Sequence, residues 1–410
     1  MSLANSNSVN QTSDKSLNIL IYFGIFWYIL IATINYFNAR PLWGDEESVF
    51  LSVKSYSFQQ MFGAPLDAIQ VFPRLYLFFI QQFSKAFDYH VLSLRFLPFV
   101  CMMTAFALWL RLAKNELKDK IEYLTFVLSW TASSMLLYYA SELKQYSMDV
   151  LAGVLYTTFI YKWQARQSMS AQTPSKMCPI FMSCLIALPF LGWFSYPSYL
   201  FALILGYNLI LATFRKEIPV QYLYFFAGSL LIALVCSYFF DMRYRHADEV
   251  TTGFGDYFIS FASVGEFFRT FGEGFNNLFS RWLVEHPRGI KMIGRFFMVF
   301  GSLYLFYGFF ADFKKDRYMI KALSTIAFAL FLGLVLLGAL HKYPFTVPRT
   351  ALFYCPFVLF LVIKGIRGLR SINSYAYVIV HGLYFIFLIL LTIGLSRLVF
   401  LNQSLFLKII

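Results

Sequence analysis

Residues 17–36 read LNILIYFGIFWYILIATINY, and residues 41–50 read PLWGDEESVF. The first stretch carries no charged residue over a length that an α-helix needs to cross the hydrocarbon core of a bilayer. The second stretch places three consecutive acids, Asp45, Glu46 and Glu47, a few residues further on. We therefore predict a membrane-spanning helix that leads into a polar loop at the membrane surface.

The rest of the chain repeats this apolar pattern. Of its 410 residues, 59% are hydrophobic, 21% are aromatic and 13% are charged, and the mean hydropathy is +0.62. A soluble domain carries about twice that share of charge. We predict an all-α polytopic membrane protein with about eleven transmembrane helices and interfacial helices on the outer face. The predicted spans are 17–36, 91–110, 121–140, 149–163, 178–193, 197–214, 221–240, 294–311, 322–340, 347–363 and 375–396.

Two further stretches favour helices that lie in the membrane interface. Residues 71–87, VFPRLYLFFIQQFSKAF, are apolar but include Arg74, two glutamines and Lys85. Between 267 and 282, aromatic residues recur at helical spacing. This aromatic stripe at 267–282 is equally compatible with side chains that pack against the helix bundle.

The distribution of basic residues indicates the orientation of the chain. If the N-terminus is cytoplasmic, the five short inner connections hold sixteen Lys and Arg, and the short outer turns at 141–148, 193–197 and 341–349 hold three. The positive-inside rule selects this orientation. We predict a cytoplasmic tail at 1–16, a membrane module at 17–163 with a first outer loop at 37–90, and a remaining transmembrane bundle at 164–410 with an outer loop at 241–293.

Composition also bounds the partners and cofactors. The net charge of +13 is a topology signal, and no basic block with interleaved aromatics indicates a nucleic-acid partner. The five cysteines show no CxxC and no metal-ligand spacing, so we predict that they are packing residues. The residues indicate no cofactor with certainty; a divalent metal is possible, and its ligands are unknown.

The positions of the acids favour chemistry at the outer surface. Fourteen of the 21 acids fall on the predicted outer side, and none falls in the middle of a predicted span. A cation-coupled transporter normally needs an ionisable group near the middle of the membrane. The pattern therefore argues against transport.

The acidic stretch has two compatible interpretations. Asp45 could be the N-cap of a helix whose first turn holds Glu46 and Glu47, where the helix dipole favours acids. It could also be a carboxylate that accepts a proton from a hydroxyl nucleophile. A capping residue can serve as a base as well.

Two other sites carry candidate residues. The turn SELKQYSMD (141–149) is either a solvated hairpin tip or, if helical, places Glu142, Tyr146 and Asp149 on one face. Arg349 lies at the outer end of a predicted span. It could bind a phosphate with two hydrogen bonds, or extend to lipid headgroups as arginines at span ends commonly do.

Several stretches together resemble the GT-C class of membrane glycosyltransferases. WGDEE (43–47), just after the first span, resembles the family's first-loop acidic motif, and the closest branch uses polyprenyl-phosphate sugars. That branch includes protein O-mannosyltransferases and the lipid A aminoarabinose transferase. Similar motifs follow in the family's order at FPRLYLFF (72–79), SLRFLPF (93–99), YYASELKQYSMDVL (138–151) and YPFTVPRTALFYCPFVLF (343–360). The resemblance covers most of 17–163 and then 341–363.

The resemblance implies roles for individual residues. The resemblance implies that Asp45 corresponds to the family's catalytic base, with Glu46 as the second candidate. Its other roles fall on two sets, the donor-phosphate ligands Arg349, Lys144 and Arg74 and the substrate-pocket residues Glu142, Tyr146 and Tyr343. The chain departs from the family at Gln70-Val71-Phe72-Pro73-Arg74, where many members have His or Lys beside paired prolines. Arg74 could replace that missing basic group.

The implied activity is transfer of a sugar from a polyprenyl-phosphate donor to a hydroxyl acceptor on the outer side of the membrane, with inversion. The acceptor is a glycan, a lipid or a protein, and membrane lipid is a further partner. We expect a bacterial inner membrane, with the active site facing the periplasm or exterior. The alternatives are a lipid-linked glycan flippase or other transporter, and an O-antigen-polymerase-like enzyme. The O-antigen-polymerase-like enzyme would use arginines of the predicted outer loop at 241–293, namely Arg243, Arg245, Arg269, Arg281 and Arg288.

Overall fold

The computed structural model describes residues 4–67, 70–169, 179–244, 255–280, 288–345 and 347–402. Every regular element in these ranges is a helix. The α-helices are α1 (Ala4–Phe37), α2 (Gly44–Ser55), α3 (Phe58–Gly63), α4 (Arg74–Lys85), α5 (Val91–Glu116), α6 (Lys120–Thr131), α7 (Ser134–Tyr139), α8 (Tyr146–Met169), α9 (Pro179–Ala187), α10 (Ser198–Phe214), α11 (Val220–Phe240), α13 (Val264–Ser280), α14 (Arg288–Lys315), α15 (Leu323–Ala339), α16 (Cys355–Ile372) and α17 (Ser374–Phe400). Short 3-10 helices are η2 (Leu188–Trp193), η3 (Met242–Tyr244), η4 (Gly255–Tyr257) and η5 (Pro348–Tyr354).

The lengths and compositions of the helices are those of an α-helical membrane protein, as predicted. Within the described residues, six segments are long and apolar enough to cross a membrane: Lys15–Phe37, Val91–Glu116, Val220–Tyr244, Met292–Lys315, Arg349–Ile372 and Ser374–Phe400. Shorter apolar helices lie at Pro179–Trp193, Ser198–Phe214 and Leu323–Ala339. All eleven predicted spans fall largely on helical elements. The expectation that all eleven cross the membrane stays a prediction.

Three predicted spans are interrupted in the structure. The one at 347–363 begins with the 3-10 helix η5, and its α-helix starts only at Cys355. The helix expected at 121–140 ends at Thr131, and α7 begins after Ser133, whose hydroxyl accepts a hydrogen bond from the backbone N–H of Leu136. Serine commonly caps helices in this way. The helix expected at 178–193 changes to a 3-10 helix at Leu188, just before Pro189, which has no N–H to continue an α-helical ladder.

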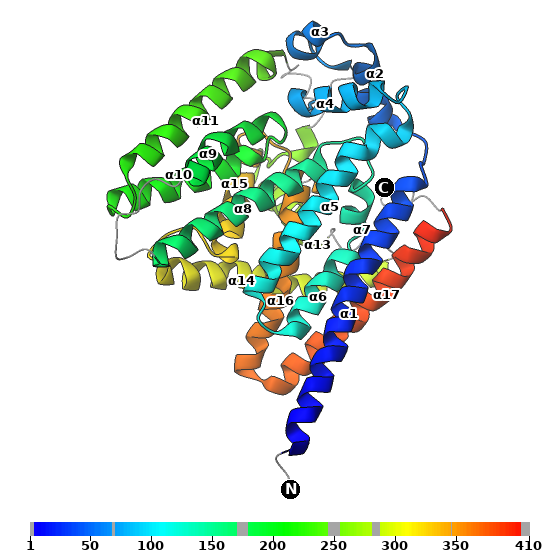
Figure 1. Cartoon of the computed structure of the whole chain (residues 1–410), viewed down its shortest axis with the longest axis vertical. Helices are drawn as coiled ribbons and strands as arrows, with labels where there is room; N and C mark the ends of the chain where they lie inside the picture. The colour runs from blue at the N-terminus through cyan, green and yellow to red at the C-terminus, as the bar shows by residue number, and fades with distance from the viewer. Residues whose placement is uncertain are drawn as a thin grey trace.

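The helices form one bundle with a cap of short helices at one end (Figure 1). Helices α1 and α17 lie side by side along one edge, and both contact α6. Helix α16 packs against α14, α6 and α17. The described residues of 37–90, the predicted first outer loop, form the cap. There α2 and α3 both pack against α4, which in turn contacts α5.

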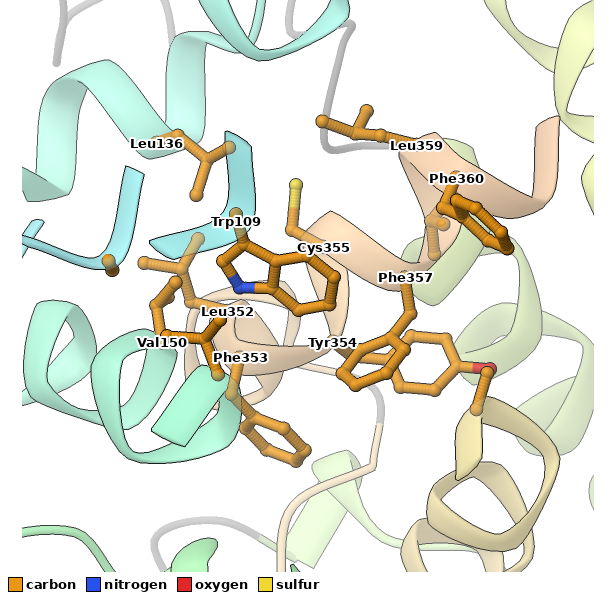
Figure 2. Packing of buried hydrophobic residues seen from close by; sticks show 14 of the residues in the cluster. Trp109, Leu136, Val150, Leu352, Phe353, Tyr354, Cys355, Phe357, Leu359 and Phe360 are labelled. Atoms are coloured by element: carbon orange, nitrogen blue, oxygen red, sulfur yellow. The ribbon is translucent and has the colours of Figure 1, made fainter. Parts of the chain in front are cut away.

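The core runs through the whole bundle and fixes the segment that precedes α16. One apolar cluster includes buried residues from Tyr28 in α1 to Val399 in α17. In Figure 2, the indole of Trp109 meets the ring of Phe357 edge-on, with a centroid distance of 4.9 Å. Leu352 of η5 lies in the same cluster, and η5 packs against α8. Helices on both sides of residue 163 share this core, and the division into modules stays a prediction.

Helix α4 occupies the first stretch that we predicted to be interfacial. Its polar residues Arg74 and Gln81 are buried, and Gln81 donates hydrogen bonds to the carbonyls of Val53 (2.9 Å) and Tyr56 (2.7 Å). Phe79, in contrast, is exposed. Arg74 and Gln81 therefore share the buried side of α4 with Tyr76, Leu77 and Ile80, and the two polar side chains satisfy backbone carbonyls there.

Helix α13 covers the second predicted interfacial stretch as far as Ser280, and residues 281 and 282 lie outside the described part. Phe271 stacks on Phe345 with ring centroids 6.2 Å apart, and Phe275 meets Phe331 edge-on at 5.8 Å. The absence of a side chain at Gly274 permits this approach, because a Cβ there would lie 2.2 Å from the ring of Phe345. These contacts are those of the alternative in which the aromatic stripe packs against the bundle.

Candidate functional site

The acidic stretch forms the first turn of α2. The helix begins at Gly44, and Trp43 occupies the N-cap position without a side-chain capping hydrogen bond. Asp45 is therefore inside the helix, and its interpretation as the N-cap is wrong. All three acids lie in the first turn, where the partial positive charge of the helix N-terminus favours carboxylates.

Asp45 contacts two cations from distant parts of the chain. Nη1 of Arg349, in η5, lies 2.7 Å from Oδ2 of Asp45, and Nζ of Lys144, in the turn before α8, lies 3.9 Å from the same oxygen. Lys144 also donates a hydrogen bond of 2.7 Å to Oε1 of Gln70. The side chains of Asp45 and Arg349 are 28% and 30% exposed, so a ligand can reach them. We call Asp45, Lys144, Arg349 and Gln70 the Asp45 cluster.

Glu46, one residue along, is fully buried and accepts four hydrogen bonds. Nε and Nη2 of Arg95 donate to its two oxygens at 2.9 and 2.6 Å, and Nη1 of Arg40 donates at 2.9 Å. The backbone N–H of Leu143 donates at 2.7 Å. Glu46 thus joins α2 to α5 and to the turn that carries Lys144. The geometry gives it an anchoring role and leaves Asp45 as the accessible carboxylate.

The sequence reasoning missed Arg95 and Arg40 as partners of this carboxylate. Arg95 falls inside the predicted span 91–110, and a charge inside a span normally needs a partner. That signal could have identified Arg95. Arg40 gave no comparable signal, because arginine at the end of a span commonly contacts lipid headgroups. Here its guanidinium carbon lies 4.6 Å from the ring centroid of Tyr138.

Glu142 lies in an irregular turn. Helix α8 begins at Tyr146, so Glu142, Tyr146 and Asp149 do not form one helical face as the helical alternative predicted. The alternative of a solvated hairpin tip is wrong as well, because Glu142 and Asp149 are buried. The turn is instead held by Glu46 through Leu143. Nε1 of Trp43 donates a hydrogen bond of 3.2 Å to Oε1 of Glu142. Burial, followed by repulsion from Glu46, raises the pKa of Glu142 to about 8.

Both predicted pocket tyrosines lie close to the Asp45 cluster. The ring of Tyr146 meets the ring of Tyr139 edge-on at 5.0 Å. The hydroxyl of Tyr343 donates a 2.5 Å hydrogen bond to the carbonyl of Thr350, the residue after Arg349. Burial raises the pKa of both phenols above the ordinary value, so they remain neutral hydroxyls. Tyr343 therefore helps to fix the segment that carries Arg349.

Arg74 lies apart from the two cations with which we grouped it. Its Nε lies 3.3 Å from Oδ1 of Asp241, and its Nη1 donates to the carbonyl of Met61 at 3.1 Å. It lines a cavity of about 280 Å³ whose other walls include Phe58, Phe62, Leu75, Phe78, Trp193 and Phe240. Because Arg74 and its partner Asp241 are both buried, whereas Arg349 and Asp45 are partly exposed, a phosphate has poorer access to Arg74.

A histidine inside a candidate span also escaped the sequence reasoning, which considered acids. His381 of α17 contacts the hydroxyls of Thr125 and Tyr377 at 2.8 and 2.9 Å through its two ring nitrogens. A lone ionisable group within a span is a default candidate for transport. Here, however, both nitrogens have hydroxyl partners, which is the arrangement expected of a structural histidine.

Within the described residues, the predicted outer loop at 241–293 gives little support to the O-antigen-polymerase-like alternative. Arg269 is exposed and pairs with Glu266 at 2.7 Å and with Glu273 at 3.1 Å. Arg243 lies over the ring of Tyr244, 4.6 Å from its centroid. Arg245, Arg281 and the side chain of Arg288 lie outside the described part. Among the residues that the structure describes, no group of three or more His, Cys, Asp or Glu is placed to hold a metal ion.

Within the described residues, fold and site together define an all-helical protein with six helices long and apolar enough to span a membrane. A partly exposed cluster of one carboxylate and two cations lies at the end of the bundle. Comparisons with family models, with curated proteins and with solved structures gave no match. The Asp45 cluster therefore carries the functional argument.

Proposed function

We propose that the protein is an integral membrane glycosyltransferase of the GT-C class. It would move a sugar from a polyprenyl-phosphate donor to a hydroxyl acceptor, either a glycan, a lipid or a protein. The observation that carries this proposal is the contact of one accessible carboxylate, Asp45, with two cations, Arg349 and Lys144. A base beside a phosphate-binding pair of cations is the minimum that such a transfer needs.

The chemistry is a single displacement at the anomeric carbon of the sugar. The acceptor oxygen forms a bond to that carbon as the bond from the carbon to the phosphate oxygen breaks. The hydroxyl proton passes to Asp45, and the electron pair of the broken bond leaves with the lipid phosphate. Arg349 and Lys144 offset the negative charge that develops on the leaving group. One displacement inverts the anomeric configuration.

The neighbouring residues support this arrangement without touching the reacting atoms. Glu46 fixes the first turn of α2 against Arg95, which holds Asp45 in position. Glu142 is buried and accepts a hydrogen bond from Trp43. Arg74 takes no part in this version of the site, because it is paired with Asp241 beside a separate apolar cavity.

The proposed location is a bacterial inner membrane, with the Asp45 cluster facing the periplasm or exterior. Asp45 and Arg349 contact each other, so the two residues lie on the same side whatever the number of spans between them. The excess of Lys and Arg in the predicted inner connections supports the assignment of that side as the outer one.

Mass spectrometry of surface glycans, lipids and proteins tests the proposal in cells. Cells that lack the gene should lose one sugar from one class of acceptor, and the wild-type gene should restore it. Glu47→Gln, which changes the exposed neighbouring acid, should also restore it, whereas Asp45→Asn should not. Identical surface sugars with and without the gene would contradict the proposal.

A further inference from the structure

In the structure, the proposed base and the proposed phosphate ligands are in contact with each other. Both Arg349 and Lys144 contact one oxygen, Oδ2 of Asp45. Resting on the proposed function, we infer that this carboxylate oxygen occupies the place of a donor phosphate oxygen, and that the arriving phosphate displaces it.

The cations are held in place by contacts that do not involve Asp45. Gln70 accepts a hydrogen bond of 2.7 Å from Lys144. The hydrogen bond from Tyr343 to Thr350 fixes the backbone next to Arg349, and the buried core around Leu352 holds the rest of η5. Departure of the carboxylate therefore leaves a preformed pair of cations, as an anion site requires.

The local charge balance favours an added anion. The ionic contacts here join four cations to two carboxylates, and the cations remain in excess even when the buried carboxyl of Glu142 is counted as a third negative charge. The cations are Arg40, Arg95, Lys144 and Arg349, and the carboxylates are Asp45 and Glu46. Positive charge remains in excess even while Asp45 is bound. A phosphate complements this excess, whereas a neutral acceptor does not.

Displacement also sets an order of binding. Before the donor arrives, Oδ2 of Asp45 accepts a hydrogen bond from Arg349 and lies 3.9 Å from Nζ of Lys144. After the phosphate takes over the two cations, this oxygen is free to accept the proton of an acceptor hydroxyl. Asp45 stays near the site because Glu46, the next residue, is anchored by Arg95. The donor therefore binds first, and its phosphate releases the base.

Binding of farnesyl phosphate to the purified full chain in detergent tests this inference. Asp45→Asn removes the competing carboxylate but keeps the shape of the side chain. We expect it to bind farnesyl phosphate about tenfold more tightly than the wild type, the effect of removing about 1.4 kcal/mol of competition. Glu47→Gln, the matched control, should bind as the wild type does, and uncharged farnesol should not distinguish the three proteins.

Equal or weaker binding of farnesyl phosphate by Asp45→Asn would overturn the inference, as would the absence of saturable binding by all three proteins. Asp45→Ser provides a second test if the first variant folds poorly, and the same gain in affinity is expected. Sugar transfer by the wild type, measured separately, tests the proposed function. If the wild type transfers sugar but Asp45→Asn does not bind farnesyl phosphate more tightly, the displacement of Asp45 by phosphate is rejected and the proposed function is not. If the affinity increases but the wild type transfers no sugar, the proposed glycosyltransferase function is rejected and the displacement is not.

Discussion

Asp45 and Glu46 are adjacent acids with opposite environments. Successive residues of an α-helix point about 100° apart. Asp45 therefore faces the partly exposed site with Arg349, whereas Glu46 faces the interior and accepts hydrogen bonds from Arg95 and Arg40. A base must be reachable by a substrate, and an anchor must be buried. The two environments therefore divide these roles between the acids.

This division predicts different effects on stability. Glu46→Gln leaves the buried guanidinium of Arg95 without its charge partner, so we expect a loss of about 3–5 kcal/mol in the free energy of unfolding. Asp45→Asn removes a partly exposed ion pair with Arg349, so we expect a smaller loss of about 1 kcal/mol. Chemical denaturation in detergent, followed by circular dichroism, measures both. Equal stability of the two variants would contradict the anchoring role of Glu46.

Arg349 is expected to act on the donor rather than on the acceptor. Arg349→Ala removes the closest cation from the site and should raise the apparent KM for the donor about tenfold or more, with a smaller effect on the acceptor. Arg349→Lys should recover part of the loss, because lysine supplies the charge without two parallel hydrogen bonds. Titration of each substrate in turn distinguishes these outcomes. An unchanged donor KM in Arg349→Ala would remove the phosphate role.

Glu142 should make stability depend on pH. Its pKa is raised from 4.5 to about 8, so between these values the folded protein keeps a proton that the unfolded chain releases. The contribution of Glu142 to stability is therefore largest below about pH 4.5 and falls as pH rises toward 8. Glu142→Gln should flatten the decrease in Tm over this window. Parallel Tm curves for the wild type and the variant would contradict the assignment.

At the scale of elements, α13 depends on close approach to Phe345. Gly274→Ala would place a Cβ 2.2 Å from that ring, and we expect a loss of about 1–3 kcal/mol in the free energy of unfolding. Gly272→Ala is the matched control, because no atom lies within 4 Å of its added Cβ, and alanine favours a helix. Hydrogen exchange should increase along α13 in the first variant and not in the second.

The apolar pattern predicted where helices occur, but not where they break. Periodicity and length were sufficient for α1, α5, α11 and α17. The interruption near Ser133 coincides with a local serine cap, whereas the irregular turn that precedes α8 depends on a tertiary contact. The turn before α8 is held by Glu46, which lies about a hundred positions earlier in the sequence. A local pattern carries no information about such a partner.

At the scale of the whole molecule, the site is assembled from segments far apart in the sequence. The count of predicted spans placed Asp45 and Arg349 on the same side of the membrane. The contact between the two residues supports this placement independently of the count. The structure pairs Arg74 with Asp241, which lies 167 positions later and could not be seen from local motifs. The sequence therefore identified the charged residues of the Asp45 cluster but not this separate ion pair.

Cysteine labelling in a Cys-free background tests the orientation. Cysteines at Ser55 and His341, both exposed near the ends of the segments that carry the cluster, should react with an impermeant reagent in intact cells. A cysteine at Lys118, exposed in a predicted inner connection, should react only after the membrane is permeabilised. Reaction of Lys118→Cys in intact cells, without reaction of the other two, would reverse the orientation.

The most direct measurement is sugar transfer by the purified protein in proteoliposomes. The vesicles would contain a panel of labelled polyprenyl-phosphate sugars with the acceptor class that surface mass spectrometry identifies. The wild type and Glu47→Gln should transfer one of these sugars with inversion at the anomeric carbon, whereas folded Asp45→Asn should lose activity by about 100-fold or more. Transfer by Asp45→Asn at the wild-type rate would contradict the assignment of Asp45 as the base of this site.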